Sequence, residues 1–90
     1  MTVINKPACA GTMESSDAYV EIENAPGLEI EVESAVYAQF GGAIYASVRD
    51  VLNECGVENA RVRVVDQGAL DCVIRARVET AVRRGSEEKI

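Results

Sequence analysis

The sequence predicts an α+β fold: a two-layer sandwich of elements in the order β-β-β-α-β-α, with an N-terminal hairpin at one edge or end of the sheet. Hydrophobic and polar residues alternate over 18–23 and 28–33, which is typical of half-buried strands. Hydrophobic residues instead recur at spacings of three, four and seven over 36–55, as on one face of an amphipathic helix. A second such helix is expected over 69–84, and two helices with apolar stripes need a sheet face to cover.

The hairpin is expected to join a short strand over 9–13 to the alternating strand over 18–23. Between them, the segment 14–17 reads Glu-Ser-Ser-Asp. This segment is turn-prone because Ser and Asp side chains can hydrogen-bond to their own backbone. Ser15 is therefore expected at the tip of the hairpin, with an acidic residue nearby on either side.

Two further strands are expected over 28–33 and 61–66, the first of them after a clear turn at 24–27. In the first of these strands, three apolar side chains point inward and three glutamates point outward. A row of outward glutamates could be a binding face, but it is more often a solvated face or a protection against aggregation. Arg61 and Arg63 also point outward, and they would neutralise the glutamates if the two strands are neighbours.

The first helix is expected to begin after Ser34, a good N-cap residue, and to end before Gly56, which fits the C′ position. Gly41 and Gly42 lie inside this helix, where they either allow close packing or mark a kink. The predicted buried stripe of the helix consists of Val36, Phe40, Ile44, Val48, Val51, Leu52 and Cys55.

The second helix follows a turn that begins at Asp66, which we interpret as a cap or turn residue. Asp71 is expected in the first turn of the helix, and Arg83 and Arg84 in its last turn, where each charge suits the helix dipole. The predicted buried stripe consists of Leu70, Val73, Ile74, Val78, Ala81 and Val82.

The 90 residues are expected to form one domain, 1–90, with a single modest core. An extended lead-in is expected over 1–8 and a frayed tail over 85–90. The sequence has neither a leader-peptide pattern at its start nor an apolar segment of membrane-spanning length. We therefore expect a cytoplasmic protein with reduced thiols.

The composition argues against several classes of function. The net charge of -6 would repel nucleic acid and anionic membrane surfaces, so neither is expected as a partner. The sequence has no histidine, which is the commonest general base and metal ligand. Cys9, Cys55 and Cys72 lie far apart, so no zinc site is expected, and we interpret them as small buried hydrophobic residues.

Ser15 lacks the neighbours that would make it a nucleophile. No histidine or lysine lies near it in the sequence, and the Gly-x-Ser-x-Gly motif of serine hydrolases is absent. We therefore predict no catalytic residue in this chain. An unactivated serine can still be the substrate of a separate enzyme that supplies the base and joins a phosphate to the hydroxyl. Such a serine only has to be exposed and accessible, and the tip of a hairpin would make it so.

Two motifs resemble a known family. The segment 10–17, Ala-Gly-Thr-Met-Glu-Ser-Ser-Asp, is similar to the modification-site segment of the acyl carrier protein (gamma subunit) family of citrate lyase. The segment 66–77, Asp-Gln-Gly-Ala-Leu-Asp-Cys-Val-Ile-Arg-Ala-Arg, resembles the Asp-x-Gly-Ala-Leu-Asp-Cys segment of that family and the Arg-Ala-Arg pattern of the helix that follows. Shorter matches occur at 5–8 and 39–41, so the resemblance covers nearly the whole chain.

The resemblance implies a non-catalytic carrier with a covalent cofactor on Ser15. In that family the corresponding serine carries a 2'-(5''-phosphoribosyl)-3'-dephospho-CoA group through a phosphodiester bond, and the thiol of the group holds an acetyl unit as a thioester. The alpha subunit of citrate lyase exchanges the acetyl unit for citrate, and the beta subunit cleaves the citryl thioester to oxaloacetate. The implied partners are these two subunits, a prosthetic-group transferase and an acetate ligase.

Three alternatives remain open at this point. Ser16 stands where the family commonly has glycine, so Ser16 is a second possible attachment site, although the alignment favours Ser15. The carrier could instead serve citramalate lyase or malonate decarboxylase. A hypothesis of a different class is a small unmodified interaction or regulatory domain.

Overall fold

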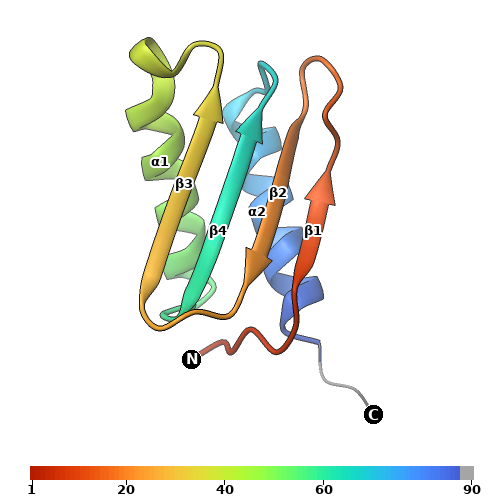
Figure 1. The fold of residues 1–90 in the computed structure, drawn as a ribbon, viewed down its shortest axis with the longest axis vertical. Helices are drawn as coiled ribbons and strands as arrows, with labels where there is room; N and C mark the ends of the chain where they lie inside the picture. Colours follow the sequence, from red (N-terminus) through yellow and green to blue (C-terminus); the bar gives the residue numbers. More distant parts are fainter. Residues whose placement is uncertain (88–90) are drawn as a thin grey trace.

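The predicted order of elements is confirmed in a computed structural model, which describes residues 1–87 (Figure 1). Two helices pack against a four-stranded sheet, as the sequence predicts. The elements are β1 (Ala8–Gly11), β2 (Ala18–Glu23), β3 (Leu28–Ser34), α1 (Tyr37–Glu54), β4 (Ala60–Asp66) and α2 (Asp71–Gly85).

The strands lie in the order β1-β2-β4-β3 across the sheet. β2 is antiparallel to both β1 and β4, so β1 and β2 form the expected hairpin at one edge of the sheet. β3 and β4 are parallel and are joined by α1, since a parallel pair needs a crossover connection. The strands predicted over 28–33 and 61–66 are therefore neighbours.

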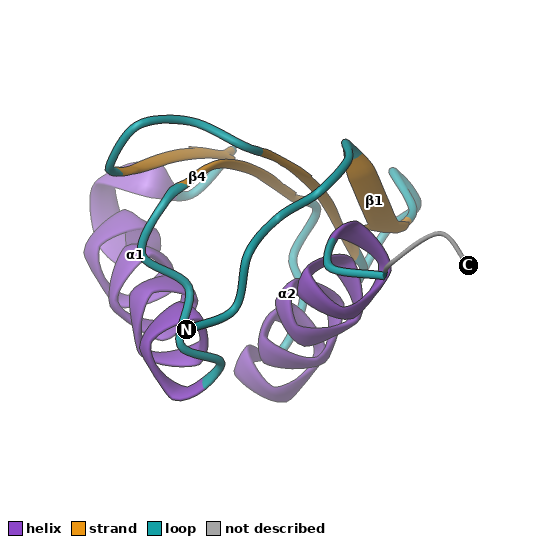
Figure 2. Ribbon diagram, turned by 90° about the horizontal axis from the view of Figure 1, so that it is seen from below, coloured by secondary structure: helices purple, strands orange, loops and turns teal. Residues whose placement is uncertain are grey.

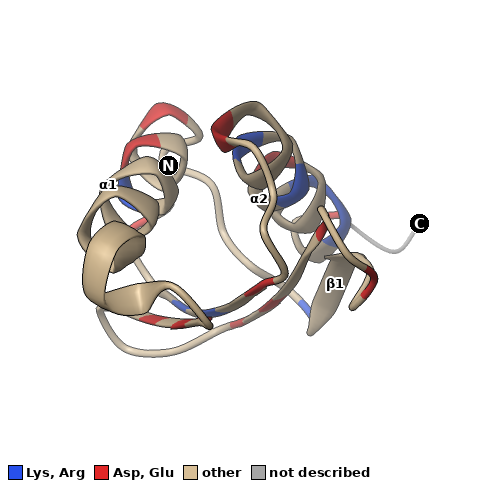
Figure 3. Ribbon diagram, turned by 90° about the horizontal axis from the view of Figure 1, so that it is seen from above, with Lys and Arg blue, Asp and Glu red and all other residues tan. Residues whose placement is uncertain are grey.

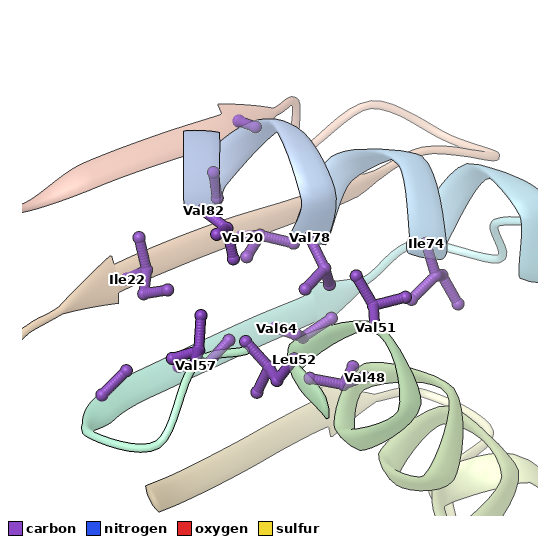
Figure 4. Close-up of a cluster of buried hydrophobic side chains, with 14 of the residues drawn as sticks. Val20, Ile22, Val48, Val51, Leu52, Val57, Val64, Ile74, Val78 and Val82 are labelled. Atoms are coloured by element: carbon purple, nitrogen blue, oxygen red, sulfur yellow. The ribbon is translucent and has the colours of Figure 1, made fainter. Parts of the chain in front are cut away.

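Both helices cover the same side of the sheet, and the core lies between the two layers (Figure 2). Alternate residues of the strands point into this layer, and each helix contributes one apolar stripe to it (Figure 4). Aliphatic residues make up the centre of the core, which includes Val20, Ile22, Val48, Val51, Leu52, Val57, Val64, Ile74, Val78 and Val82. Most of the stripe predicted for each helix is thus confirmed.

The opposite side of the sheet carries rows of ion pairs. Arg61 and Arg63 lie on β4, between the glutamates of β2 and those of β3, as expected if these strands were neighbours. Their nitrogen–oxygen distances are 3.1 Å from Arg61 to Glu23, 3.0 Å from Arg61 to Glu29, 2.9 Å from Arg63 to Glu21 and 3.2 Å from Arg63 to Glu33. Since the partners are exposed, each pair contributes little stability, and its main effect is to neutralise charge.

The expected N-cap of the first helix is wrong. Ser34 is the last residue of β3, and α1 is preceded by Val36, which makes no side-chain cap. The Ser34 hydroxyl instead donates to Asp66 Oδ2 over 2.9 Å and accepts from the Val36 N–H over 3.2 Å. It therefore links the ends of two parallel strands, a role that only their pairing creates.

The predicted buried stripes are wrong at their N-terminal ends. Val36, Phe40 and Leu70 are 42%, 53% and 71% exposed, respectively. Val36 and Leu70 precede their helices, so helical periodicity does not decide where their side chains point. Phe40 lies in the first turn of α1, where α1 and α2 leave an open groove between them.

The cysteines are less buried than expected. Cys9 and Cys72 are exposed, and Cys55 is half-buried at the end of α1. Cys9 points to the side of the sheet that no helix covers, since its neighbour Ala10 points into the core. The prediction for Gly56 is confirmed, because this residue follows the helix with φ +75°.

The lead-in is anchored to the rest of the protein, and α2 extends one residue into the predicted tail. Ile4, in the lead-in, is 2% exposed, and Thr2 forms an isolated bridge with Val57. Gly85, expected to begin a frayed tail, is the buried last residue of α2 and accepts a 2.8 Å hydrogen bond from the Asn5 N–H. The last three residues of the predicted tail lie outside the described residues. Neither helix in residues 1–87 is long and apolar enough to cross a membrane.

Two leucines test the boundary of the core. Leu52 is fully buried and Leu70 is 71% exposed. We expect Leu52→Ala to lower the free energy of unfolding by about 2–5 kcal/mol, because it leaves a cavity in the core. Leu70→Ala, the matched control, should change it by less than about 0.5 kcal/mol. Urea unfolding under reducing conditions measures both, and equal losses would contradict this description of the core.

Candidate functional site

The loop between β1 and β2 carries Ser15 and Ser16, and both residues are exposed. The loop lies at the end of the sheet where the β3–α1 and β4–α2 connections also lie (Figure 1). The β4–α2 connection is next to it, since β2 pairs with β4. Ser15 therefore lies on a hairpin loop, as predicted.

Asp17 organises the inside of this loop. Its Oδ2 accepts a 2.7 Å hydrogen bond from the Thr12 hydroxyl, and its Oδ1 accepts one of 2.7 Å from the Ala18 N–H. The Thr12 hydroxyl also accepts from the Glu14 N–H, and the Asp17 N–H donates to the Glu14 carbonyl. These hydrogen bonds join the start of the loop at Thr12 to its end at Asp17, so the backbone that carries the serines is held in one conformation.

Arg77 of α2 completes the environment of Asp17. Its Nε lies 2.9 Å from Asp17 Oδ1 and its Nη2 lies 3.1 Å from Oδ2, so the guanidinium binds both carboxylate oxygens. The Asp17 side chain is only 15% exposed. The hydrogen bond from Arg77, followed by those from Thr12 and the Ala18 N–H, lowers the pKa of Asp17 from 3.8 to about 2. The carboxylate therefore stays charged and fixes the loop to the helix.

The turn before α2 supports the other side of the loop. The Ser16 N–H donates to the Gln67 carbonyl over 2.7 Å, and the Gln67 N–H donates to the Asp17 carbonyl over 2.9 Å. Asp66, predicted to be a cap or turn residue, accepts hydrogen bonds through Oδ1 from the N–H groups of Gly68 and Ala69. The two motifs that resemble the known family are thus in direct contact.

The two serines differ in backbone conformation. Ser16 has a φ of 66°, and it is the one residue other than glycine with a positive φ in the described part of the chain. This left-handed conformation favours glycine, which is the residue that the resemblance implies at this position. Ser15 has no such restriction. At Gly11, which also has a positive φ, an added Cβ would lie 1.8 Å from the Ala18 carbonyl oxygen.

The loop can present a hydroxyl but has little means of activating one. Asp17, the best-placed acid, is committed to Arg77 and to the loop itself. The sequence points to Ser15 and its acidic neighbours but predicts no role for Arg77. The Arg-Ala-Arg pattern marks Arg77 only through the resemblance, because a pair separated by 60 positions leaves no local periodicity.

A family model and a curated relative both match nearly the whole chain. A family model described as "Malonate decarboxylase delta subunit (MdcD)", an acyl carrier family, matches residues 5–85. The citrate lyase acyl carrier protein of Haemophilus influenzae strain PittEE is 51% identical over 87 residues, covering 97% of this chain and 92% of the relative. The chain belongs to the citrate lyase acyl carrier protein family.

Further relatives support this membership. The citrate lyase acyl carrier protein of Escherichia fergusonii is also 51% identical, over 94% of this chain and 90% of the relative. Among solved structures, a chain in the crystal structure of a Pseudomonas malonate decarboxylase hetero-tetramer in complex with malonate has a TM-score of 0.75. That match covers 93% of this chain and 91% of the other, and at 20% identity it shows a common fold.

Membership confirms the predicted function as a citrate lyase acyl carrier protein that is itself non-catalytic. An acyl carrier protein requires a prosthetic group, and carriers of this family are subunits of a citrate lyase-like complex. The structure fits a covalent group, because the loop offers exposed hydroxyls on a backbone that Asp17 and Arg77 hold in place.

The Asp17–Arg77 pair should make stability depend on pH. Because folding lowers the pKa of Asp17, the pair stabilises the fold fully above pH 3.8 and is lost as the pH falls toward about 2. Between pH 6 and pH 2.5, we expect the free energy of unfolding, measured with urea, to decrease less in Asp17→Asn than in the wild type. Glu14→Gln, which removes an exposed carboxylate of the same loop, is the control. An unchanged loss in Asp17→Asn would contradict this role of the pair.

Ser16→Gly should stabilise the protein, because it removes a side chain from a left-handed backbone conformation. We expect a gain of up to about 1 kcal/mol in unfolding free energy, since part of the relief is offset by the greater chain entropy of glycine. Ser15→Gly, the matched control, should lower stability by about 0.5–1 kcal/mol. Urea unfolding would contradict the assignment if the two substitutions had equal effects.

Proposed function

We propose that Ser15 is the residue to which the prosthetic group is attached, and that the group is 2'-(5''-phosphoribosyl)-3'-dephospho-CoA. The observation that carries the proposal is the contrast between the two exposed serines. Ser15 lies in the middle of a loop that its neighbours hold in place, whereas the backbone N–H of Ser16 is bonded to Gln67 and its φ is positive. A modifying enzyme that moves the backbone at Ser15 would leave the contact between Ser16 and Gln67 in place, whereas the same movement at Ser16 would break it.

The chain's own residues would then have two tasks. Ser15 would anchor the group through a phosphodiester bond, and Asp17 with Arg77 would keep the anchoring loop from moving relative to α2. When bound, the group supplies a thiol that holds the acyl unit as a thioester. A carrier of this kind accelerates a reaction by keeping the acyl unit close to each active site, in place of free diffusion.

The proposed partners are the alpha and beta subunits of citrate lyase, a prosthetic-group transferase that modifies Ser15, and an acetate ligase that loads the thiol. Support comes from curated relatives that are about half identical over nearly their full length. The whole chain, 1–90, would act as one carrier domain in the cytoplasm.

Mass spectrometry of the protein from its own cells tests the attachment site. With the citrate pathway induced, we expect the peptide that contains Ser15 to carry the mass of the nucleotide–thiol group. Ser15→Ala should abolish the adduct, because no hydroxyl remains at that position. Ser16→Ala, which removes the neighbouring hydroxyl, should keep it.

The opposite outcomes are equally clear. An adduct that survives in Ser15→Ala and disappears in Ser16→Ala would assign the site to Ser16. Unmodified protein from induced cells would contradict the attachment proposal.

The acyl unit found on the thiol distinguishes the pathways. Acetyl and citryl units indicate citrate lyase, a malonyl unit indicates a malonate decarboxylase-type complex, and a citramalyl unit indicates citramalate lyase.

A further inference from the structure

An apolar groove opens between the N-terminal ends of α1 and α2. It has a volume of about 290 Å³, close to the lower end of the range for small-ligand sites. The side chains that line it are mainly aliphatic or aromatic: Val36, Phe40, Ala43, Ile44, Ala69 and Ile74. The groove accounts for the exposure of Val36 and Phe40, which the sequence predicted to be buried.

The polar groups at the groove are already satisfied. Asp66 accepts hydrogen bonds from Ser34, Gly68 and Ala69, and Asp71 is bound by Ser47 and by Arg75. The first three turns of α1, from Tyr37 to Val48, contain no charged residue, and this end of the helix is uniformly tan in Figure 3. A ligand of the groove would therefore meet apolar surface and two carboxylates whose oxygens are already hydrogen-bonded.

The groove lies next to the serine loop. The Ser16 N–H is bonded to the carbonyl of Gln67, and Gly68 and Ala69, the next two residues, line the groove. Ser15 directly precedes Ser16, and Gly68 directly follows Gln67. Because the two segments are joined by this hydrogen bond, Ser15 lies within about 10 Å of Gly68 at the rim of the groove. A flexible arm on Ser15 would thus hold its free end at a high local concentration beside this groove.

We propose that this groove receives the acetyl-thioester end of the arm on Ser15 and shelters it from water between transfers. This inference rests on the proposed function. The end of such an arm is uncharged and narrow, which matches an apolar groove of this volume. A binding partner of the same face would have to displace this end before using it.

The charge of the groove makes the shelter selective. Asp66 and Asp71 are the charged residues among those that line it, and both are acidic. Arg75 neutralises Asp71 through a 2.8 Å contact, but Asp66 has no such cationic neighbour among the groove residues. An acyl unit that bears carboxylates, such as citryl, would be repelled and desolvated at a cost. The acetyl-loaded arm is therefore held, and the arm loaded with a carboxylate-bearing unit is released.

Cleavage of the thioester by hydroxylamine tests the shelter without any partner subunit. The holo-protein is acetylated on the thiol of its arm, and loss of acetyl is followed by the mass of the peptide 15–21, which is released by cleavage after Glu14 and Glu21 and contains no cysteine. Phe40→Ala should cleave about three- to tenfold faster than the wild type, because it removes one wall of the groove. Tyr37→Ala is the matched control: Tyr37 is also 53% exposed on α1 but does not line the groove, and its rate should be unchanged.

A second measurement locates the arm. Comparison of NMR spectra of the holo-protein with free thiol and with acetyl should show shifts at the methyl groups of Ile44 and Ile74. An arm loaded with succinyl, a carboxylate-bearing unit, should leave these methyl groups as they are in the unmodified protein. Equal cleavage rates in wild type and Phe40→Ala, with shifts confined to the serine loop, would overturn the shelter and leave the attachment to Ser15 intact. Absence of an adduct would overturn both.

Discussion

The bidentate contact between Arg77 and Asp17 is the interaction on which the functional end of the molecule depends. Asp17 gathers the hydrogen bonds of the serine loop, and Arg77 ties that carboxylate to α2. Without the guanidinium, a carboxylate that is only 15% exposed would lose its principal charged partner. The loop would then be joined to the rest of the protein mainly through β1, β2 and the backbone contacts of Gln67.

The two sides of the sheet have different roles: one forms the core and the other carries ion pairs. One side packs aliphatic residues against α1 and α2, and the other pairs the arginines of β4 with glutamates from both neighbouring strands. This arrangement places the stable core behind the strands and leaves their ends free for function. At one end of the sheet, the serine loop is hydrogen-bonded to the turn before α2, and residues of that turn line the apolar groove.

A carrier needs features different from those of an enzyme. It must present one group at a fixed place and leave the chemistry to others, so its acids serve structure: Asp66 supports a turn, and Asp17 supports a loop. Val36 and Phe40 are exposed apolar residues that line one groove, and the proposed shelter for the arm would give this groove a use. The same reasoning explains why histidine, the commonest general base, is dispensable here.

Local patterns in the sequence determined most of the fold. The period-two alternation identified β2 and β3 and the outward side of each, and the helical period identified α1 and α2. The opposite charges of Arg61, Arg63 and the glutamates allowed β3 and β4 to be neighbours, but only the tertiary structure decided the order of the strands. The resemblance in two motifs pointed to Ser15. Only the tertiary structure decided that Arg77 meets Asp17, that Ser16 has a positive φ, and that Phe40 and Leu70 are exposed. Those features depend on contacts between segments that are far apart in the sequence. The periodicity of hydrophobic residues reports only local structure, so it does not reveal such contacts.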